Sequence, residues 1–567
     1  MFYIAAIAAY FSVVTAVLQS RTNSTLPVVD LGYELHRAAN VNSTSSVPYY
    51  NFTNIRFGQP PVGTLRFNPP VAASEQHSKV ITDGTEAIRT CPQATPAWEL
   101  EAAEFLGAYL SGGNLTAYTN KPWNTTSGNQ TIPTPGPGEI EDCLFLDVFT
   151  PTKVFDLAQN HTYGSGAPVL VWIYGGGYTA GSKSLFGSPA SLIARSTQDG
   201  ADDGVIFVEL NYRLGVFGWL TGNNDITANA GLLDQRLALE WVHNNIYKFG
   251  GDPNRVTVMG ESAGAGSIMH HIASPPNYTQ RFQRAIPQSP AFIPFLPSQG
   301  KPMFDSILKV ASTLTGKNVS SASDLRALPF NTLYAVNAVA VGTSPYGTFT
   351  FGPVVDNSYV PDIPLRRLAA GLYHQDITVM VGHNADEGLL FAPPYLQGNA
   401  EWYTEFKLLF PTMSNQSITY VTEDLYPEAY NGQPYNTTYG RTAQAISDYL
   451  VGCNAHLLAS IPGSFGYYFS VPPAIHGEDI AYTFFNGDTS TSDEGLTVQA
   501  PIATAFQEII GTFVAAGGAG LIEEGILPYG ENFTVTNIGV TNFKGQIRDP
   551  AARAAHCNFW TAAPYDT

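Results

Sequence analysis

The sequence predicts an α/β protein with a large, mostly parallel sheet that is covered by helices on both faces. Short apolar runs at Val169–Tyr174, Val205–Leu210, Val256–Met259 and Ile377–Val381 have the length and composition of buried strands. Helical stretches such as Leu232–Phe249 separate these runs. Buried strands that alternate with helices are typical of parallel sheets, because each crossover helix covers a face of the sheet.

The third of these runs leads into the pentapeptide Gly260-Glu261-Ser262-Ala263-Gly264, and a small-residue helical stretch, Ala265–Ile272, follows it. A G-x-S-x-G sequence between a strand and a helix is typical of a nucleophile elbow, a sharp turn that presents a serine hydroxyl to a histidine. Only small residues fit beside such a turn. We therefore expect Ser262 to be a nucleophile.

The strand predicted at Val169–Tyr174 ends in three consecutive glycines, Gly175–Gly177. Backbone N–H groups stabilise a developing oxyanion only where no side chain blocks their approach. The sequence therefore predicts an oxyanion hole formed by Gly176, Gly177 and Ala263, the residue after the nucleophile. A phosphate-binding loop is disfavoured, because neither G-x-x-x-x-G-K-[ST] nor G-x-G-x-x-G spacing is present there.

An acid and a histidine should follow the serine along the chain. Glu387 lies just past the strand predicted at Ile377–Val381, and Asp386 beside it is an alternative that motif order does not exclude. Among eleven histidines, His476 is the candidate base, because it follows an aromatic strand at Gly466–Val471 in a turn-rich segment. In this arrangement Glu387 orients His476, which takes the serine proton.

Length and charge limit the remaining possibilities. The candidate catalytic residues are spread from position 262 to position 476 of 567 residues and must meet at one site, which favours one large domain. A net charge of −19 argues against nucleic acid and anionic membranes as partners. Since the sequence has no His/Cys cluster with metal-ligand spacing, we expect no metal and no cofactor.

The N-terminal segment has the composition of an export signal. Phe2–Leu18 contains no charged residue, and Val14–Ala16 offers small residues for cleavage, so we expect a signal peptide at 1–20, cut near 16–20, and a mature chain of 21–567. The apolar run is shorter than the ~20 residues of a membrane span, and we expect no stable membrane insertion. Twelve N-x-[ST] sequons indicate a secreted, extracellular glycoprotein. They are Asn23, Asn42, Asn51, Asn114, Asn124, Asn129, Asn160, Asn277, Asn318, Asn415, Asn436 and Asn532.

Six further blocks make the chain similar to one known family. They are Phe57–Phe67, Glu141–Val148, Asn211–Gly215, Gly231–Arg236, Phe249–Pro253 and Cys557–Trp560. Together with the elbow and the glycines, they resemble the type-B carboxylesterase/lipase family, which includes cholinesterases, fungal lipases and sterol esterases. The resemblance implies the α/β-hydrolase fold, a triad of Ser262, Glu387 and His476, and oxyanion donors at Gly176, Gly177 and Ala263.

The resemblance also implies which side chains pair with one another. The four cysteines would form the disulfides Cys91–Cys143 and Cys453–Cys557, which agrees with an oxidising compartment. Arg66 with Glu141, and Arg213 with Asp234, would form buried ion pairs whose disruption costs about 3–5 kcal/mol.

In the family, the loop that the first disulfide closes, residues 91–143, forms a lid or rim over the active site. Its apolar positions Trp98, Phe105 and Tyr109 have helical spacing, and their face either lines the entrance or packs on the body of the protein. Cholinesterases place a tryptophan shortly before the second cysteine, whereas residues 131–136 contain no aromatic here. A choline ester is therefore disfavoured as a substrate.

These observations predict a secreted serine hydrolase that acts on small-molecule carboxylic esters through an acyl-enzyme intermediate. A lipase or sterol esterase acting at an interface, and an esterase or acyl transferase of secreted-metabolite biosynthesis, are the alternatives. A noncatalytic adhesion module is disfavoured, because Ser262, Glu387 and His476 are all present.

Overall fold

The computed structural model describes residues 26–73, 81–86, 88–121, 123, 133–160, 166–197, 204–292, 295–487 and 498–566. The predicted signal peptide at 1–20 and three of the sequons, Asn23, Asn124 and Asn129, lie outside these ranges. None of the helices in the described ranges combines the length and the apolar composition needed to cross a bilayer.

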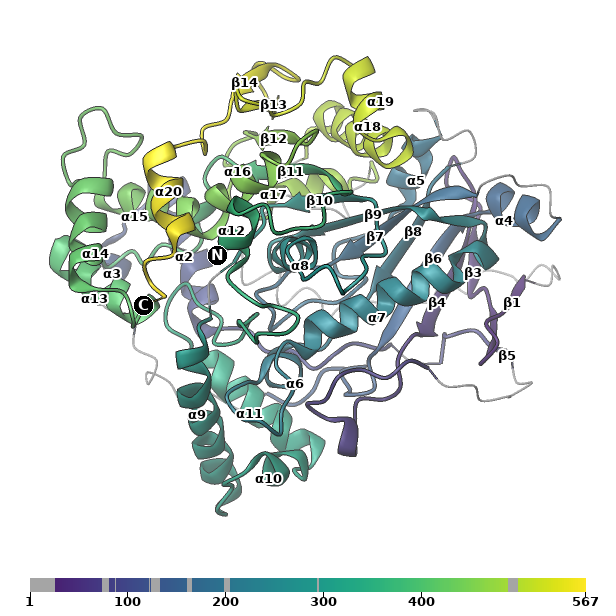
Figure 1. Cartoon of the computed structure of the whole chain (residues 1–567), viewed down its shortest axis with the longest axis horizontal. Helices are drawn as coiled ribbons and strands as arrows, with labels where there is room; N and C mark the ends of the chain where they lie inside the picture. The colour runs from purple at the N-terminus through teal and green to yellow at the C-terminus, as the bar shows by residue number, and fades with distance from the viewer. Residues whose placement is uncertain are drawn as a thin grey trace.

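An eleven-stranded sheet forms the centre of the molecule (Figure 1). From one edge to the other its strands are β14 (Gln546–Arg548), β13 (Thr534–Ile538), β12 (Phe465–Phe469), β11 (Thr378–Asn384), β10 (Arg284–Gln288), β9 (Gly251–Glu261), β7 (Ala167–Ile173), β8 (Ile206–Leu210), β6 (Phe145–Pro151), β4 (Tyr49–Arg56) and β3 (Asn40–Asn42). All neighbours from β13 to β8 are parallel, and only the strands at the two edges pair antiparallel. This order confirms the mostly parallel sheet that the sequence predicts.

The predicted strands occur with small shifts at their ends. β9 begins at Gly251, five residues before the predicted run, because Gly251 pairs with Ala167 of β7. Every residue of β7 and β8 is buried, which explains why their sequences are continuously apolar and do not alternate.

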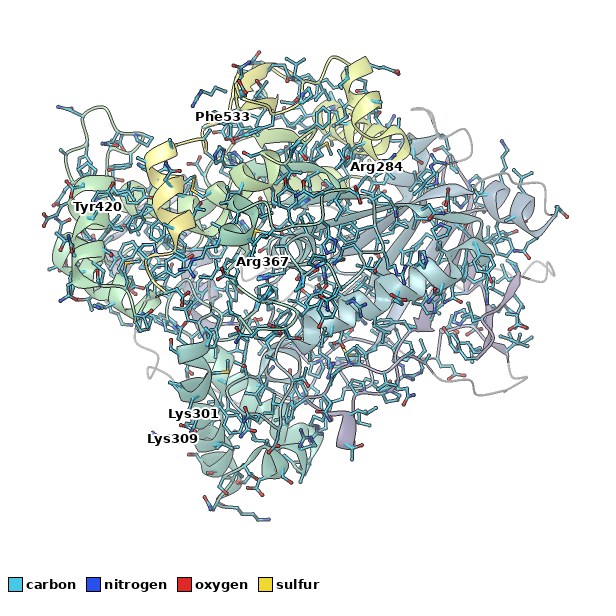
Figure 2. The ribbon with its side chains drawn as sticks, in the orientation of Figure 1. Arg284, Lys301, Lys309, Arg367, Tyr420 and Phe533 are labelled. Atoms are coloured by element: carbon cyan, nitrogen blue, oxygen red, sulfur yellow. A yellow bond between two sulfur atoms is a disulfide. The ribbon has the colours of Figure 1, made fainter. Side chains whose placement is uncertain are left out.

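Helices cover both faces of the sheet (Figure 1). α7 (Ala230–Asn245) and α8 (Ala263–Ile272) pack together against β9, whereas α18 (Ala500–Ala516) packs on α5 (Ala190–Ser196) and β7. Side chains tie these layers together: the Arg284 guanidinium of β10 donates to the carbonyl of Val514 in α18 at 2.8 Å (Figure 2).

Further helices extend beyond the sheet. α9 (Pro297–Thr315) packs on α11 (Phe330–Gly342), and both point away from the sheet in Figure 1, while α2 (Ala97–Leu110), α13 (Asn399–Leu409) and α15 (Thr438–Ser447) lie at another side. The remaining helices are α3 (Thr116–Thr119), α4 (Thr152–Gln159), α6 (Gly215–Trp219), α10 (Ala322–Arg326), α12 (Pro364–Ala369), α14 (Asn415–Thr419), α16 (Cys453–Ala459), α17 (Glu478–Thr483), α19 (Gly518–Glu523) and α20 (Ala554–Ala562). A small sheet contains β1 (Val28–Asp30), β2 (Leu35–Arg37) and β5 (Ile81–Thr82).

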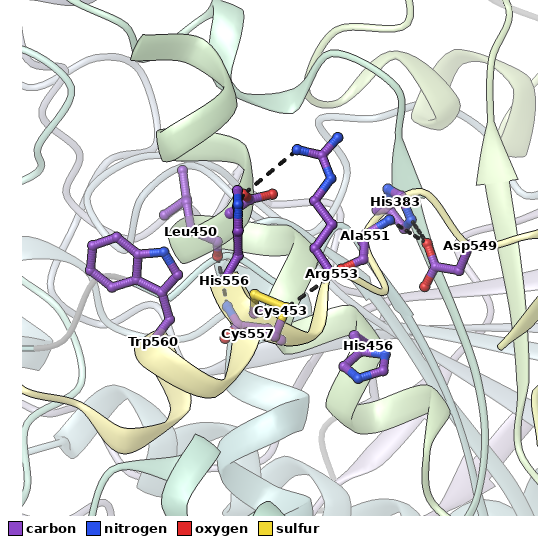
Figure 3. Close-up of a disulfide and its surroundings, with 12 residues drawn as sticks. His383, Leu450, Cys453, His456, Asp549, Ala551, Arg553, His556, Cys557 and Trp560 are labelled. Carbon is purple, nitrogen blue, oxygen red and sulfur yellow. Dashed lines mark hydrogen bonds and ion pairs between the residues drawn. A yellow bond between two sulfur atoms is a disulfide. The ribbon is translucent and has the colours of Figure 1, made fainter. Parts of the chain in front are cut away.

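Two disulfides and two buried ion pairs join distant parts of the chain. Cys91–Cys143 closes a loop of 52 residues, and Cys453–Cys557 joins α16 to α20 across 104 residues (Figure 3). Loops of this length constrain the unfolded chain by roughly 4–5 kcal/mol each in the chain-entropy model. The ion pairs are bidentate, with N–O distances of 2.5 and 2.6 Å in the first and 2.7 and 2.8 Å in the second. They join Arg66 to Glu141 and Arg213 to Asp234.

Candidate active site

Ser262 lies at the sharp turn between β9 and α8. Its φ and ψ are 54° and −122°, a strained conformation for a residue with a side chain. The two flanking glycines are required, because a Cβ at Gly260 would lie 2.5 Å from the carbonyl oxygen of Ile173, and a Cβ at Gly264 would lie 2.0 Å from it. A hydrogen bond of 3.0 Å from the Ser262 N–H to the carbonyl of Gln288 holds the turn in place.

The structure brings Ser262, His476 and Glu387 into contact from three segments of the chain. His476 Nε2 lies 2.8 Å from Ser262 Oγ, and His476 Nδ1 lies 2.5 Å from Glu387 Oε2. The other carboxylate oxygen, Glu387 Oε1, accepts hydrogen bonds of 2.6 Å from Ser289 Oγ and from the backbone N–H of Asn384. These bonds fix the carboxylate, which in turn fixes the imidazole.

Two neighbouring titratable residues, Asp386 and His383, take no part in these contacts. Asp386 is exposed, and within the described residues its carboxylate has neither a hydrogen bond nor an ion pair. The ring of His383 pairs with Asp549 at 2.9 Å, on the side of β11 toward the disulfide (Figure 3).

Charges around His476 favour its protonated form. Burial alone would lower the pKa of this imidazole, but the carboxylates of Glu261 and Glu387 outweigh burial and raise the pKa above its usual range. Glu261 Oε1 lies 3.4 Å from His476 Nε2. Burial raises the pKa of Glu261, whereas the contact with His476 keeps the pKa of Glu387 low despite its burial. The site is therefore prepared to stabilise an imidazolium.

Gly177 and Ala263 line the same cavity as Ser262, and Gly176 directly precedes Gly177. Within the described part of the chain, the N–H groups of Gly176, Gly177 and Ala263 have no hydrogen-bond acceptor. Gly176 has φ of 103°, and a Cβ at this position would lie 2.4 Å from the Ala180 carbonyl oxygen. Position 176, one of the predicted oxyanion donors, therefore requires glycine.

An apolar cavity of about 190 Å³ opens at Ser262. Most of its lining is aromatic or aliphatic, which suits an uncharged organic ligand. The lining residues are Gly177, Tyr178, Ser262, Ala263, Ala291, Phe295, Gln299, Pro345, Thr348, Phe349, Thr350, Phe351, Gly352, Phe391, Leu408, Leu409 and Leu450. No group of three or more His, Cys, Asp or Glu residues in the described ranges is arranged to hold a metal ion.

The face of α2 that contains Trp98 and Phe105 packs on the body of the protein. Trp98 is fully buried, donates from Nε1 to the Thr348 carbonyl at 2.7 Å, and contacts the rings of Phe349 and Phe391. It supports the cavity wall from behind. Phe105 contacts Tyr109, Tyr118 and Tyr439, and neither Trp98 nor Phe105 lines the cavity.

Sequence reasoning missed the residues behind the catalytic side chains. Ser289 and Asn384 hold Glu387, but neither belongs to a motif. Glu261 lies inside the elbow pentapeptide, yet the motif leaves that position free, and only the fold brings it to His476.

Comparison with known proteins identifies the family. The family described as "Carboxylesterase family" matches residues 36–518. The chain belongs to the carboxylesterase family, the type-B carboxylesterases and lipases. It is a carboxylic ester hydrolase, as the sequence predicts.

Carboxylesterases from fungi are among its relatives. Carboxylesterase patB of Aspergillus clavatus is 37% identical over 95% of this chain and 97% of that protein, and Carboxylesterase patB of Penicillium expansum is 36% identical over 94% and 95%. Secreted lipase 1 of Botryotinia fuckeliana is 30% identical over 70% of this chain and 67% of that protein. The crystal structure of Aspergillus niger EstA superimposes with a TM-score of 0.74 at 24% identity, over 96% of this chain and all of that one, and confirms the α/β-hydrolase fold.

Proposed function

We propose that this carboxylesterase acts through a triad of Ser262, His476 and Glu387, with Gly176, Gly177 and Ala263 as the oxyanion hole. The observation that carries the proposal is the unbroken chain of contacts from Ser262 Oγ to His476 at 2.8 Å and from His476 to Glu387 at 2.5 Å, at the end of an apolar cavity. The three free N–H groups beside the serine support it.

In the first half of the reaction, Ser262 Oγ attacks the ester carbonyl carbon while His476 Nε2 takes the hydroxyl proton. The carbonyl oxygen becomes negative, and the three N–H groups stabilise that charge. His476 then gives its proton to the leaving alkoxide oxygen, so an alcohol departs and the acyl group stays on Ser262. Glu387 stabilises the imidazolium throughout but keeps its own charge.

In the second half, water replaces the alcohol and repeats the same steps in reverse, which releases the carboxylic acid and restores Ser262. An alcohol in place of water would give acyl transfer. The lining of the cavity favours uncharged, apolar esters in either case.

We further propose that the protein is secreted and that residues 21–567 form one domain with a rim at 91–143. The proposal of secretion rests on the two disulfides and on relatives that include secreted lipases. One continuous sheet from β3 to β14 supports a single domain. The sequons in the described ranges fit the same compartment.

Replacement of the nucleophile tests the catalytic proposal. Ser262→Ala should lower kcat on the order of 10⁶-fold with an unchanged circular dichroism spectrum, because it removes the attacking atom and leaves the fold intact. A fluorophosphonate probe should label Ser262 alone, as read by peptide mass spectrometry. Residual turnover close to wild type, or a label on another serine, would disprove the assignment.

A further inference from the structure

A buried carboxyl group beside the active site lacks a partner. Glu405 of α13 is 8% exposed, its Oε1 is sealed from solvent, and within the described residues its side chain has neither a hydrogen bond nor an ion pair. Burial raises the pKa of Glu405 to about 7. An unpaired buried polar group costs free energy, so a protein that keeps one there needs a reason for it.

The carboxyl group borders a small recess of about 20 Å³. A water molecule needs roughly 10–15 Å³ of such space, so the recess holds one water-sized group and excludes an alkyl chain or a ring. The wall also contains Tyr346, Tyr449 and Thr442. The Thr442 hydroxyl is already engaged: it accepts from Trp402 Nε1 and donates to the Thr438 carbonyl. Apart from Glu405, the recess is largely apolar and aromatic. Its lining is Tyr346, Gly347, Phe391, Pro393, Leu396, Trp402, Glu405, Phe406, Leu409, Thr442, Ala445, Ile446 and Tyr449.

One layer of side chains separates this recess from the cavity at Ser262. Phe391 and Leu409 line both spaces, and the Phe391 ring packs on the His476 imidazole with centroids 5.0 Å apart. Leu409 lies at the end of α13, is only partly buried and follows the exposed Leu408. A substrate group that enters the recess from the cavity would pass between Leu409 and Phe391.

We propose that this recess is a specificity subsite in which Glu405 accepts a hydrogen bond from a hydroxyl group carried by the ester substrate. The inference rests on the proposed function, since the ester carbonyl must lie at Ser262 while the hydroxyl reaches Glu405. A hydroxyl group fits the volume and supplies the donor that the carboxyl group lacks. The substrate class is thus an apolar ester with one hydroxyl group remote from the ester bond.

Matched pairs of esters test the subsite. The probes are p-nitrophenyl alkanoates with four to ten acyl carbons and the same esters with a terminal hydroxyl group. Binding is measured on the Ser262→Ala protein, where turnover does not interfere, and kcat/KM on the wild type. At one chain length or more, we expect the hydroxylated ester to bind roughly tenfold more tightly, the effect of one hydrogen bond to a buried carboxyl group.

Variants of Glu405 assign the preference to this side chain. Glu405→Leu should bring the ratio of the affinities for the hydroxylated and the plain ester close to one. Glu405→Gln, which keeps the side-chain volume, should give an intermediate ratio of affinities. The matched control is Glu401→Leu, an exposed position one turn earlier in α13, where the ratio should stay as in wild type. Melting temperatures confirm that each variant is folded.

Two results would overturn the inference: the same ratio in wild type and Glu405→Leu, or plain esters binding as tightly as hydroxylated ones at every length. Absence of turnover for all esters in the wild type, with the binding preference intact on Ser262→Ala, would instead contradict the proposed function.

Discussion

At the scale of single residues, hydrogen bonding and burial distinguish Glu387 from Asp386 as the acid that contacts His476. Glu387 is held by three hydrogen bonds, whereas the neighbouring Asp386 is exposed. Glu387→Gln should lower kcat by at least about a hundredfold, because the imidazolium loses its counter-charge, and Asp386→Asn should change kcat less than about threefold. Steady-state kinetics on a soluble aryl ester measure both. A larger loss of kcat in Asp386→Asn than in Glu387→Gln would identify Asp386 as the acid of the triad.

Glu261 should control the pH dependence of the reaction. Activity requires neutral His476, so kcat/KM should rise with pH through the pKa of this imidazole, which lies above the ordinary value of about 6.5. Glu261→Gln removes a carboxyl group that, once ionised, places a negative charge 3.4 Å from Nε2, and the substitution therefore disfavours the imidazolium. In this variant the pKa of His476 should fall, and the acid limb of the pH profile of kcat/KM should move to lower pH.

Profiles of kcat/KM between pH 5 and 11 on an uncharged ester measure this shift, because the pKa of His476 is raised to about 9. Glu240→Gln is a suitable control, since Glu240 pairs with Arg281 at the surface of α7. A Glu261→Gln profile that overlies the wild type, or one that moves to higher pH, would show that Glu261 does not act on His476.

The sequence predicts a residue's role best when neighbouring residues in the chain determine its geometry. The turn at Ser262 needs glycines two residues away on either side, so its geometry is visible in five consecutive residues. Ser289 acts on a carboxylate 98 positions later, and Glu405 lines a recess that several elements form together. No short pattern contains such contacts, because they arise only when the chain has folded.

At the scale of elements, α2 illustrates what periodicity leaves open. The apolar spacing predicts the helix, and α2 does span Ala97–Leu110. Spacing cannot tell which neighbour covers an apolar face, and the structure places Phe105 against Tyr109, Tyr118 and Tyr439, away from the cavity. The part of this face at Phe105 thus packs on the body and does not line the entrance.

Phe105→Ala should therefore act on stability and not on substrate choice. Phe105 is 1% exposed, and truncating a buried phenylalanine costs about 3–5 kcal/mol. The melting temperature should fall, while the ratio of kcat/KM for a decanoyl and an acetyl ester should stay constant. Leu100→Ala, at a 46% exposed position of the same helix, should change neither quantity. A lower decanoyl-to-acetyl ratio of kcat/KM in Phe105→Ala would instead show that Phe105 lines the entrance to the active site.

At the scale of the whole molecule, the proposed catalytic residues come from segments that are far apart in the chain. The segments that follow β9, β11 and β12 supply Ser262, Glu387 and His476, and the parallel order of these strands brings their carboxyl ends to one edge of the sheet. The alternation of strands and helices predicts a mostly parallel sheet. The sequence blocks that resemble the type-B carboxylesterase/lipase family further predict the α/β-hydrolase fold. The two outermost strands, β3 and β14, were not predicted, because each is only three residues long.

The fold also decides which sequons can hold a glycan. A glycan is attached to the chain during export and has to remain outside the folded protein. Asn42 and Asn51 are partly buried: Asn42 Nδ2 donates to the Tyr49 hydroxyl at 2.8 Å, and Asn51 lies within β4, paired on both sides, with its Oδ1 sealed. The other seven sequons of the described ranges are exposed. They are Asn114, Asn160, Asn277, Asn318, Asn415, Asn436 and Asn532.

In protein secreted from a eukaryotic host, we therefore expect glycans at most of the seven exposed positions and none at Asn51. Enzymatic removal of N-glycans in H₂¹⁸O converts each occupied asparagine to a labelled aspartate, which peptide mass spectrometry locates. Asn51→Gln should leave the glycan mass of the intact protein unchanged, whereas Asn318→Gln, at an exposed turn after α9, should lower it by one glycan. A glycan on Asn51 would contradict the packing of β4 between β3 and β6. An entirely unglycosylated product would contradict export through the secretory pathway, because none of the seven exposed acceptor asparagines would then have been modified.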